Sequence, residues 1–279
     1  MQKQIHKAKK SLGQNFLKGE FALRKIIEAW EIKKSDVILE IGPGRGALTN
    51  KLLETRCKVL AIEKDGELCE FLKIKFEKEI LSGQLNLILG DILKWEIGNY
   101  KFSNYKVIAN IPYNITGAIL KKFLTAEHQP ELMVLMIQHE VAQRIVAQNK
   151  KESLLSISVK AYGEPKMVMK VDKRYFSPQP KVNSAIIAIK NISRDKLVNL
   201  LSTWDVDKPA GRQVDEIRFW EIVKAGFAHK RKKLSSNLKQ ICQSKALADF
   251  GNKRAENLTL ADWVELASSE GMEKSLLSE

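Results

Sequence analysis

The sequence is poor in cysteine and has no long hydrophobic run. Its three cysteines, Cys57, Cys69 and Cys242, show no metal-ligand spacing, and so sparse and odd a number argues against a disulfide framework. No stretch approaches eighteen consecutive apolar residues, so no transmembrane helix is expected, and the basic N-terminus lacks the apolar run of a secretory signal. We therefore expect a cytoplasmic protein with buried free cysteines, without a membrane partner and without a resident metal ion.

Positive charge, in contrast, is abundant and unevenly distributed. The net charge is +14 at pH 7; residues 1–190 carry +12 of it and residues 191–279 carry +2. So basic a protein is attracted to polyanions, and nucleic acid is the leading class of partner, ahead of an anionic membrane surface. A length of 279 residues with 44% hydrophobic residues suits one large and one small domain.

Strand and helix patterns alternate over the first two thirds of the chain. Short apolar runs predict strands at residues 37–41, 58–62, 85–89, 105–109 and 132–137. Helical patterns lie between these strands, and a first helix has Leu23, Ile26, Ile27 and Trp30 on one face. Such alternation predicts an α/β fold with a mostly parallel sheet and helices on both faces.

The pattern changes after the fifth strand. A helix is predicted at 153–162, and two further strands at 166–171 and 182–189 flank a proline-rich link. Residues 191–279 show helical patterns only. We therefore predict a sheet domain over 1–190 and a helical domain over 191–279. The first begins with a basic arm, expected to be flexible, that contains Lys3, Lys7, Lys9 and Lys10.

Three successive strands end in residues suited to binding a nucleoside-like cofactor. The first runs into Gly42-Pro-Gly44-Arg-Gly46, where glycines let the backbone approach a ligand and the next helix offers free N–H groups. Glu63 follows about twenty residues later, where an acidic residue reaches ribose hydroxyls, and Asp91 can accept a hydrogen bond from an adenine amino group. A nicotinamide dehydrogenase is the competing interpretation, but the glycine spacing is G-x-G-x-G and no hydride-handling constellation is visible.

The fourth strand ends in Asn110-Ile111-Pro112-Tyr113, the most specific chemistry in the chain. An adenine N6 amine is a poor nucleophile, and acceptors that hold its two hydrogens would aim its lone pair at an electrophile. The Asn110 side-chain oxygen and a carbonyl of Ile111 or Pro112 can do this, and proline also fixes the backbone. Tyr113 offers a face on which a base can stack.

Four segments are distinctive in combination: Lys10–Leu17 (KSLGQNFL), Glu40–Gly46 (EIGPGRG), Asn110–Thr116 (NIPYNIT) and Phe176–Val182 (FSPQPKV). Together they resemble the ribosomal RNA adenine dimethyltransferases, most closely the 16S rRNA (KsgA/RsmA) family. The resemblance implies a Rossmann-like class I methyltransferase sheet, S-adenosylmethionine as cofactor and a small helical RNA-recognition domain. It implies that the cofactor is contacted by Asn15, Leu17, Gly42, Glu63, Asp91 and Asn110. It also implies that Asn110 and Tyr113 frame the target adenine, with Phe176 as a second stacking face.

A second branch shares this fold and the N-I-P-Y motif. Its enzymes dimethylate 23S rRNA and confer macrolide resistance. The fuller Ser11–Leu17 opening and the basic run Phe227–Leu238 favour the 16S branch, although Ser236 stands where the branch has an asparagine. That branch implies, as substrate, two adjacent adenosines in the 3′-terminal hairpin loop of 16S rRNA within an immature small subunit. The 23S branch, and a ribosome-assembly factor that acts mainly by binding, stay open as alternatives. We expect a monomer.

Overall fold

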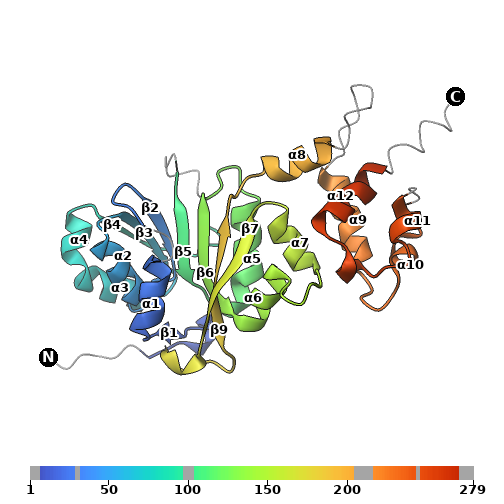
Figure 1. Ribbon diagram of the computed structural model, residues 1–279. Helices are drawn as coiled ribbons and strands as arrows, with labels where there is room; N and C mark the ends of the chain where they lie inside the picture. The colour runs from blue at the N-terminus through green and yellow to red at the C-terminus, as the bar shows by residue number, and fades with distance from the viewer. Residues whose placement is uncertain (1–6, 29–31, 97–103, 204–215, 243–245, 270–279) are drawn as a thin grey trace. The chain divides into compact units, whose positions relative to one another are not determined.

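The computed structural model describes residues 7–28, 32–96, 104–203, 216–242 and 246–269 (Figure 1). The chain forms two compact units, Met1–Ala142 with Pro165–Ile192 and Gln143–Glu164 with Ser193–Glu279. It therefore passes between the units three times, and the predicted boundary near residue 190 lies close to the last passage. Within the described ranges, no helix is both long and apolar enough to span a membrane.

A seven-stranded sheet forms the centre of the first unit, in the order β4-β3-β2-β5-β6-β9-β7. Its strands are β2 (Val37–Ile41), β3 (Lys58–Glu63), β4 (Leu85–Leu89), β5 (Lys106–Asn110), β6 (Leu132–Gln138), β7 (Glu164–Val171) and β9 (Ser184–Lys190). The pairs from β4 to β6 are parallel, and β9 runs antiparallel to β6. The predicted mostly parallel sheet is confirmed, and each predicted strand is present within two residues of its expected bounds.

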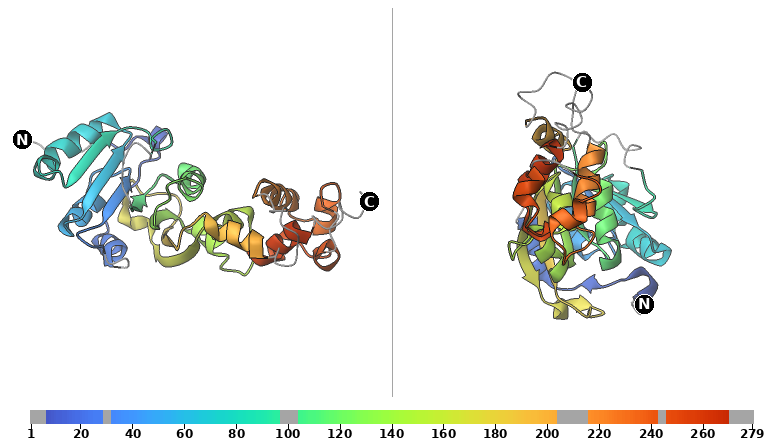
Figure 2. Two further views of the ribbon diagram at one scale, coloured as in Figure 1. Left: turned by 90° about the horizontal axis from the view of Figure 1, so that it is seen from above. Right: turned by 90° about the vertical axis from the view of Figure 1, so that its right-hand side faces the viewer.

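Helices cover both faces of this sheet (Figure 2). They are α1 (Glu20–Glu28), α2 (Ala47–Glu54), α3 (Gly66–Lys75), α4 (Glu77–Leu81), α5 (Thr116–Leu124) and α6 (His139–Val146). In α1 the predicted apolar face is present, since Leu23 and Ile26 are buried and Ile27 packs against the core. Trp30, the fourth member of that pattern, lies outside the described residues.

The central strands are buried on both faces, as parallel strands covered by helices must be. In β6 every residue from Leu132 to Ile137 is buried, and in β9 so is every residue from Ser184 to Ile189. Such strands have near-continuous apolar sequences, which is why the sequence located them well. The three cysteines are free and buried, as predicted.

A second, two-stranded sheet was not predicted from the sequence. β1 (Phe16–Leu17) pairs antiparallel with β8 (Phe176–Ser177), with Leu17 opposite Phe176. Short 3-10 turns stand beside these strands, η1 (Lys10–Leu12) before β1 and η4 (Lys173–Tyr175) before β8. Two-residue strands have no periodicity to detect, and this pairing joins segments about 160 residues apart.

The regular structure of the second unit is helical among its described residues, apart from Glu164, the first residue of β7. It contains α7 (Leu154–Lys160), α8 (Asp195–Thr203), α9 (Glu216–Gly226), α10 (Leu234–Leu238), α11 (Ala246–Phe250) and α12 (Leu260–Ser269), with the turn η5 (Ala255–Asn257). Phe219 and Trp263 are fully buried in its core. The segment that contains α7 joins this unit because the N–H of Glu152 donates to Glu256 O at 2.7 Å and Lys151 pairs with the Glu256 carboxylate at 2.8 Å.

Candidate functional site

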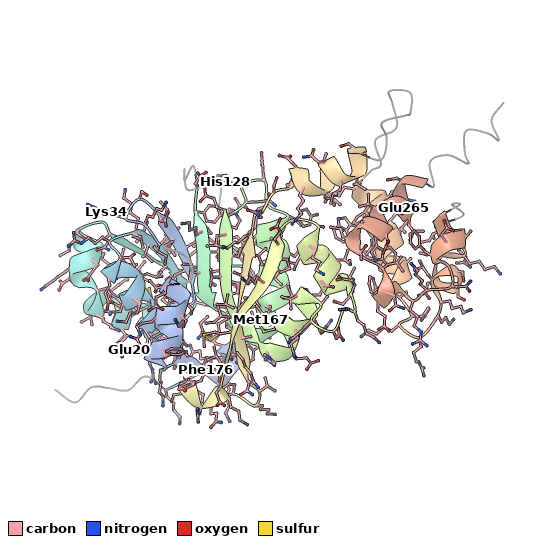
Figure 3. The ribbon with its side chains drawn as sticks, in the orientation of Figure 1. Glu20, Lys34, His128, Met167, Phe176 and Glu265 are labelled. Carbon is pink, nitrogen blue, oxygen red and sulfur yellow. The ribbon has the colours of Figure 1, made fainter. Side chains whose placement is uncertain are left out.

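The candidate site lies where the order of the central strands reverses. β2 has β3 on one side and β5 on the other, so the connections that leave β2 and β5 diverge. Open α/β sheets bind ligands at the carboxyl ends of the strands at such a point. Because Ile41 lies opposite Ala109, the next residues, Gly42 and Asn110, are brought close together. This is the end of the sheet marked by Phe176 in Figure 3, and His128 marks the opposite end.

The glycine loop after β2 forms one wall. Gly42 and Gly44 both have positive φ, +64° and +60°, which side chains rarely adopt. A Cβ at Gly42 would have no neighbour within 4 Å, so the backbone there faces open space. A Cβ at Gly44 would lie 3.0 Å from the Phe16 ring, so the loop and the N-terminal segment approach closely. A ligand can therefore lie directly against the backbone at Gly42.

Glu63 ends β3 inside the site. Its Oε2 accepts the N–H of Gly44 and its Oε1 accepts the N–H of Asp65, both at 2.9 Å, and only 5% of the residue is exposed. Burial raises the pKa of the Glu63 carboxyl, and the two backbone N–H groups oppose that shift. The carboxylate is therefore held rigidly and retains lone pairs for the hydroxyl groups of a ligand.

Asp91 is held from two sides after β4. Its Oδ2 lies 2.9 Å from Lys64 Nζ, and its Oδ1 accepts the N–H of Leu93 at 3.0 Å. The hydrogen bond from Lys64 holds the pKa of Asp91 below its usual range. The residue therefore caps a turn, as isolated aspartates often do, and also lines the cavity.

Glu40, within β2, is a site residue to which the sequence analysis gave no role. It is 1% exposed, lines the cavity, and its Oε2 has no hydrogen-bond partner among the described residues. Burial raises the pKa of its carboxyl to about 8, helped by the nearby charge of Glu63. Its position in the E-x-G-x-G-x-G segment was the available signal, but burial of a charge inside a strand cannot be inferred from sequence.

The side-chain amide of Asn110 has a defined orientation at the end of β5. Its Nδ2 donates to the carbonyl oxygen of Asn15 at 3.1 Å, which leaves Oδ1 as an acceptor for a ligand. The carbonyl of Pro112 already accepts the N–H of Ile115 at 3.2 Å. Of the two backbone carbonyls considered from sequence, that of Ile111 is therefore the better second acceptor.

Tyr113 begins the turn η3 (Tyr113–Ile115) that follows Pro112. Its hydroxyl lies 2.7 Å from Ser184 Oγ, and Ser184 is fully buried at the start of β9. Burial raises the pKa of the Tyr113 phenol, so the ring is neutral at pH 7. The hydrogen bond fixes the outer end of the ring, which is partly exposed and lines the cavity.

The N-terminal strap, residues 9–18, forms the opposite wall through residues 11–18. Lys9 Nζ pairs with Asp65 Oδ1 at 2.8 Å, and Gln14 Nε2 donates to Asp65 Oδ2 at 2.9 Å. The expectation of a flexible basic arm is therefore wrong for Lys9, because a buried carboxylate holds it. Lys3, from the same expected arm, lies outside the described residues. Asp65 itself was missed, although its place just before a helical pattern was the signal of an N-cap.

Nine of the ten predicted site residues line one cavity of about 230 Å³: Asn15, Leu17, Gly42, Gly44, Glu63, Asp91, Asn110, Pro112 and Tyr113. Phe176 is not among the lining residues. It is 3% exposed and packs in the hydrophobic core opposite Leu17. The cavity lining is rich in oxygen acceptors, which suits a small molecule that carries hydroxyl and amino donors.

The family model for "Ribosomal RNA adenine dimethylase" matches residues 5–272. Curated relatives named "Ribosomal RNA small subunit methyltransferase A" are 36% identical to the chain. The relative from Dehalococcoides mccartyi aligns over 92% of this chain and 86% of its own, and that from Fusobacterium nucleatum over 93% and 96%.

Two solved structures share the fold over nearly the whole chain. A dimethyladenosine transferase from Plasmodium falciparum superposes with a TM-score of 0.71 and 27% identity, and covers 90% of this chain and 95% of its own. The 23S rRNA methyltransferase ErmE also has a TM-score of 0.71, with 23% identity, and covers 92% and 100%. The second likeness shows the fold alone.

Proposed function

Because the chain belongs to the ribosomal RNA adenine dimethylase family, we propose that it dimethylates the N6 amines of two adjacent adenosines in the 3′-terminal hairpin loop of 16S rRNA. It is an S-adenosylmethionine-dependent methyltransferase, and its substrate is ribosomal RNA. The curated relatives are named for the small subunit, which supports the 16S branch, whereas the likeness to ErmE extends to the fold only.

The residues present fit S-adenosylmethionine. The open backbone at Gly42 leaves room for a ligand against the loop, and Glu63 is fixed by two N–H groups with lone pairs to spare. The ribose hydroxyls are assigned to Glu63 and the adenine amino group to Asp91. The buried Oε2 of Glu40 has no partner among the described residues, so the cavity contains a carboxyl group whose hydrogen bonding the protein itself does not complete. When bound, the cofactor supplies an electrophilic methyl group.

Asn110 and Ile111 provide the acceptors for the target amine in this proposal. Asn110 Oδ1 and the carbonyl oxygen of Ile111 each accept one N6 hydrogen, which turns the nitrogen lone pair towards the methyl group. As the nitrogen accepts the methyl group, the bond between that carbon and the cofactor sulfur would break and leave a neutral thioether product. The amine nitrogen becomes positively charged, and the two acceptors stabilise that charge until one proton leaves to water. The contribution is positioning and preorganised electrostatics rather than a strong base. The observation that carries it is the Asn110–Asn15 hydrogen bond, since it leaves the amide oxygen available.

Tyr113 is proposed to stack on the target base, because its ring is held by Ser184 and lines the cavity. Stacking of a base on an aromatic ring contributes about 1–3 kcal/mol. Phe176 keeps its proposed role as the second stacking face only if β8 shifts when RNA binds, since its ring is buried in the present arrangement.

The substitution Asn110→Ala tests the assigned chemistry. We expect it to lower the rate of methyl transfer by about a hundredfold to a thousandfold, because one transition-state acceptor is removed. Binding of S-adenosylhomocysteine, measured by calorimetry, should change far less. Asn86→Ala, at an exposed asparagine of β4, is the matched control. Unchanged turnover of Asn110→Ala on its RNA would refute the role.

The RNA target is tested by mapping modified adenosines in 16S and 23S rRNA by primer extension, with and without the enzyme. We propose that the preferred substrate is an immature small subunit in the cytoplasm, bound by the monomer, with the helical domain over 191–279 recognising RNA. Modification of 23S rRNA alone would replace the proposed function by that of the resistance branch. Rescue of subunit maturation by Asn110→Ala would show that binding matters more than catalysis.

A further inference from the structure

Asp65 holds the N-terminal strap through an arrangement that capping a helix does not require. The residue is 2% exposed, and its Oδ1 accepts the N–H of Glu67 at 3.1 Å, which caps α3. The same oxygen pairs with Lys9 Nζ, and Oδ2 accepts from Gln14 Nε2. A cap needs one acceptor oxygen. The second oxygen and the negative charge of Asp65 therefore serve the strap.

Gln14 is fixed at both ends of its side-chain amide. Its Nε2 donates to Asp65 Oδ2 at 2.9 Å, and its Oε1 accepts the backbone N–H of Lys9 at 2.8 Å. Neither contact survives a flip of the amide, so Gln14 has one orientation only. Because Gln14 adjoins Asn15 in the strap, fixing Gln14 also fixes the carbonyl oxygen that accepts from Asn110.

These contacts form a continuous path between the two halves of the site. Glu63 Oε1 accepts the N–H of Asp65, Asp65 accepts from Gln14, and Asn15 O accepts from Asn110 Nδ2 at 3.1 Å. The path starts at the carboxylate assigned to the ribose and ends at the amide assigned to the target amine. The Phe16 ring adds a further contact, since Arg45 lies 4.5 Å from its centroid.

We propose that Asp65 is a positioning residue that fastens the strap through Gln14, so that Asn15 holds the Asn110 amide with its oxygen directed at the target amine. The proposal rests on the proposed function for the identity of that amine. Asp65 touches neither substrate nor cofactor in it. The contact between Asp65 and Gln14 therefore links cofactor binding, which uses Glu63 and the strap, to the orientation of the Asn110 side-chain oxygen.

A reciprocal exchange of hydrogen-bonding groups separates this role from capping. Asp65→Asn keeps the oxygen that caps α3, but it places an NH2 group opposite the NH2 of Gln14, so two donors face each other. A flip of the Gln14 amide would not help, because its NH2 would then face the backbone N–H of Lys9. Gln14→Glu sets two carboxylates against each other. In the double variant, the amide at position 65 donates to the carboxylate at position 14, so the hydrogen bond returns with its direction reversed.

We expect each single variant to lower kcat/KM for RNA by about ten- to a hundredfold, because a small misplacement of a catalytic group has an effect of this size. The double variant should return to within about threefold of the parent. Glu70→Gln, an exposed acid of α3 that pairs with Lys73, is the matched control and should leave activity unchanged.

A readout without turnover is hydrogen exchange at residues 16–18, where β1 pairs with β8 and the N–H of Lys18 donates to Tyr175 O at 2.7 Å. Both single variants should exchange at least about tenfold faster there, with an unchanged melting temperature, and the double variant should be protected again. If a single variant does not fold, Gln14→Ala should show the same faster exchange without a new buried charge.

Wild-type exchange and activity in both single variants would overturn the proposal and leave Asp65 as a helix cap only. So would a double variant no better than the worse single one. If instead the parent enzyme does not methylate 16S rRNA, the proposed function fails, while the exchange pattern still decides whether Asp65 fastens the strap.

Discussion

The two units of the chain place their charged groups differently. The first unit buries three carboxylates, Glu40, Glu63 and Asp65, none of which is more than 5% exposed. Among the described residues of the second unit, the buried polar side chains are those of Ser156 and Ser268. Carboxylates of the second unit form ion pairs nearer the surface, such as Glu256 with Lys151, where the Glu256 side chain remains 30% exposed. The least exposed of those described is Glu152, which pairs with Lys160 and is 12% exposed.

This difference indicates what each unit is built to do. Burying a carboxylate costs free energy unless hydrogen bonds or opposite charges offset it, and at Glu40 the offset is incomplete. A protein that only needed stability would not keep such a group. The first unit therefore gives up stability for carboxyl groups in its cavity, and the second combines an apolar core with a charged surface.

Removing a buried carboxylate from the first unit should have the largest effect. In Glu63→Ala, the N–H groups of Gly44 and Asp65 lose their acceptor, and so do the ribose hydroxyls that we assign to Glu63. We expect affinity for S-adenosylhomocysteine to fall about a thousandfold, or ~4 kcal/mol, when measured by calorimetry. Glu256→Ala, in the second unit, should bind like the parent. Equal affinities of the two variants for S-adenosylhomocysteine would show that the buried carboxyl groups of the first unit do not serve cofactor binding.

The pH dependence of Glu40→Gln should be the next largest effect. With a raised folded-state pKa of about 8, Glu40 stays protonated in the folded protein while it ionises in the unfolded chain above pH 4.5. Its contribution to stability is therefore fully present below pH 4.5, and is lost as pH rises to about 8. The complete pKa shift would correspond to about 5 kcal/mol, and we expect the difference in unfolding free energy between variant and parent to change by about 3 kcal/mol.

The measurement is urea unfolding of the cofactor-free parent and of Glu40→Gln between pH 4.5 and 9. The stability of the variant relative to the parent should rise over this interval and level off above pH 8. A constant difference would mean that Glu40 ionises normally and that its burial carries no penalty.

In the second unit, packing rather than charge should be the sensitive property. Gly226 lies at the end of α9, and a Cβ there would overlap the buried Trp263 ring. Gly226→Ala should lower the free energy of unfolding by about 2 kcal/mol and leave cofactor affinity unchanged. Gly117→Ala in α5, where a Cβ meets nothing within 4 Å, should instead stabilise by about 0.5–1 kcal/mol. Equal free energies of unfolding for Gly226→Ala and Gly117→Ala, measured by denaturant titration, would contradict this prediction.

The exposed basic turn of the second unit should have the smallest single effect. Lys230 and Lys232 lie between α9 and α10, close to the N-terminus of α10, where cations oppose the helix dipole. We propose that they contact phosphate groups of the RNA. Replacing both with Gln should weaken RNA binding severalfold. The slope of the logarithm of the binding constant against the logarithm of salt concentration should become shallower by about one to two. Lys51→Gln, in the first unit, is the control and should not change RNA binding. Loss of cofactor affinity when Lys230 and Lys232 are both replaced would contradict the assignment of cofactor binding to the first unit.

Much of the fold followed from local pattern. The strands β2 to β6 are short apolar runs bounded by glycine or polar residues, and their alternation with helices indicated the sheet. Glu63 and Asn110 end their strands, Asp91 follows β4 by two residues, and all three line the cavity. Parallel strands bring their carboxyl ends to one edge, so position in sequence translates directly into position in space.

Other features depended on contacts between distant segments. Phe176 lies in a motif that suggested stacking, yet its pairing with Leu17 buries it. The segment 143–164 joins the helical unit through Glu256, more than a hundred residues away. No local periodicity encodes such partners.

Taken by itself, the amino-acid sequence determined the alternating α/β framework, the glycine loop and the set of strand-end acceptors, because these depend on backbone preferences and short-range periodicity. Only the tertiary structure decided that the strap closes the cavity, that Asp65 holds Lys9 and Gln14, and that the Asn110 amide is oriented by Asn15. These contacts join residues 51 to 95 positions apart, and hydrogen-bond geometry exists only once the chain has folded.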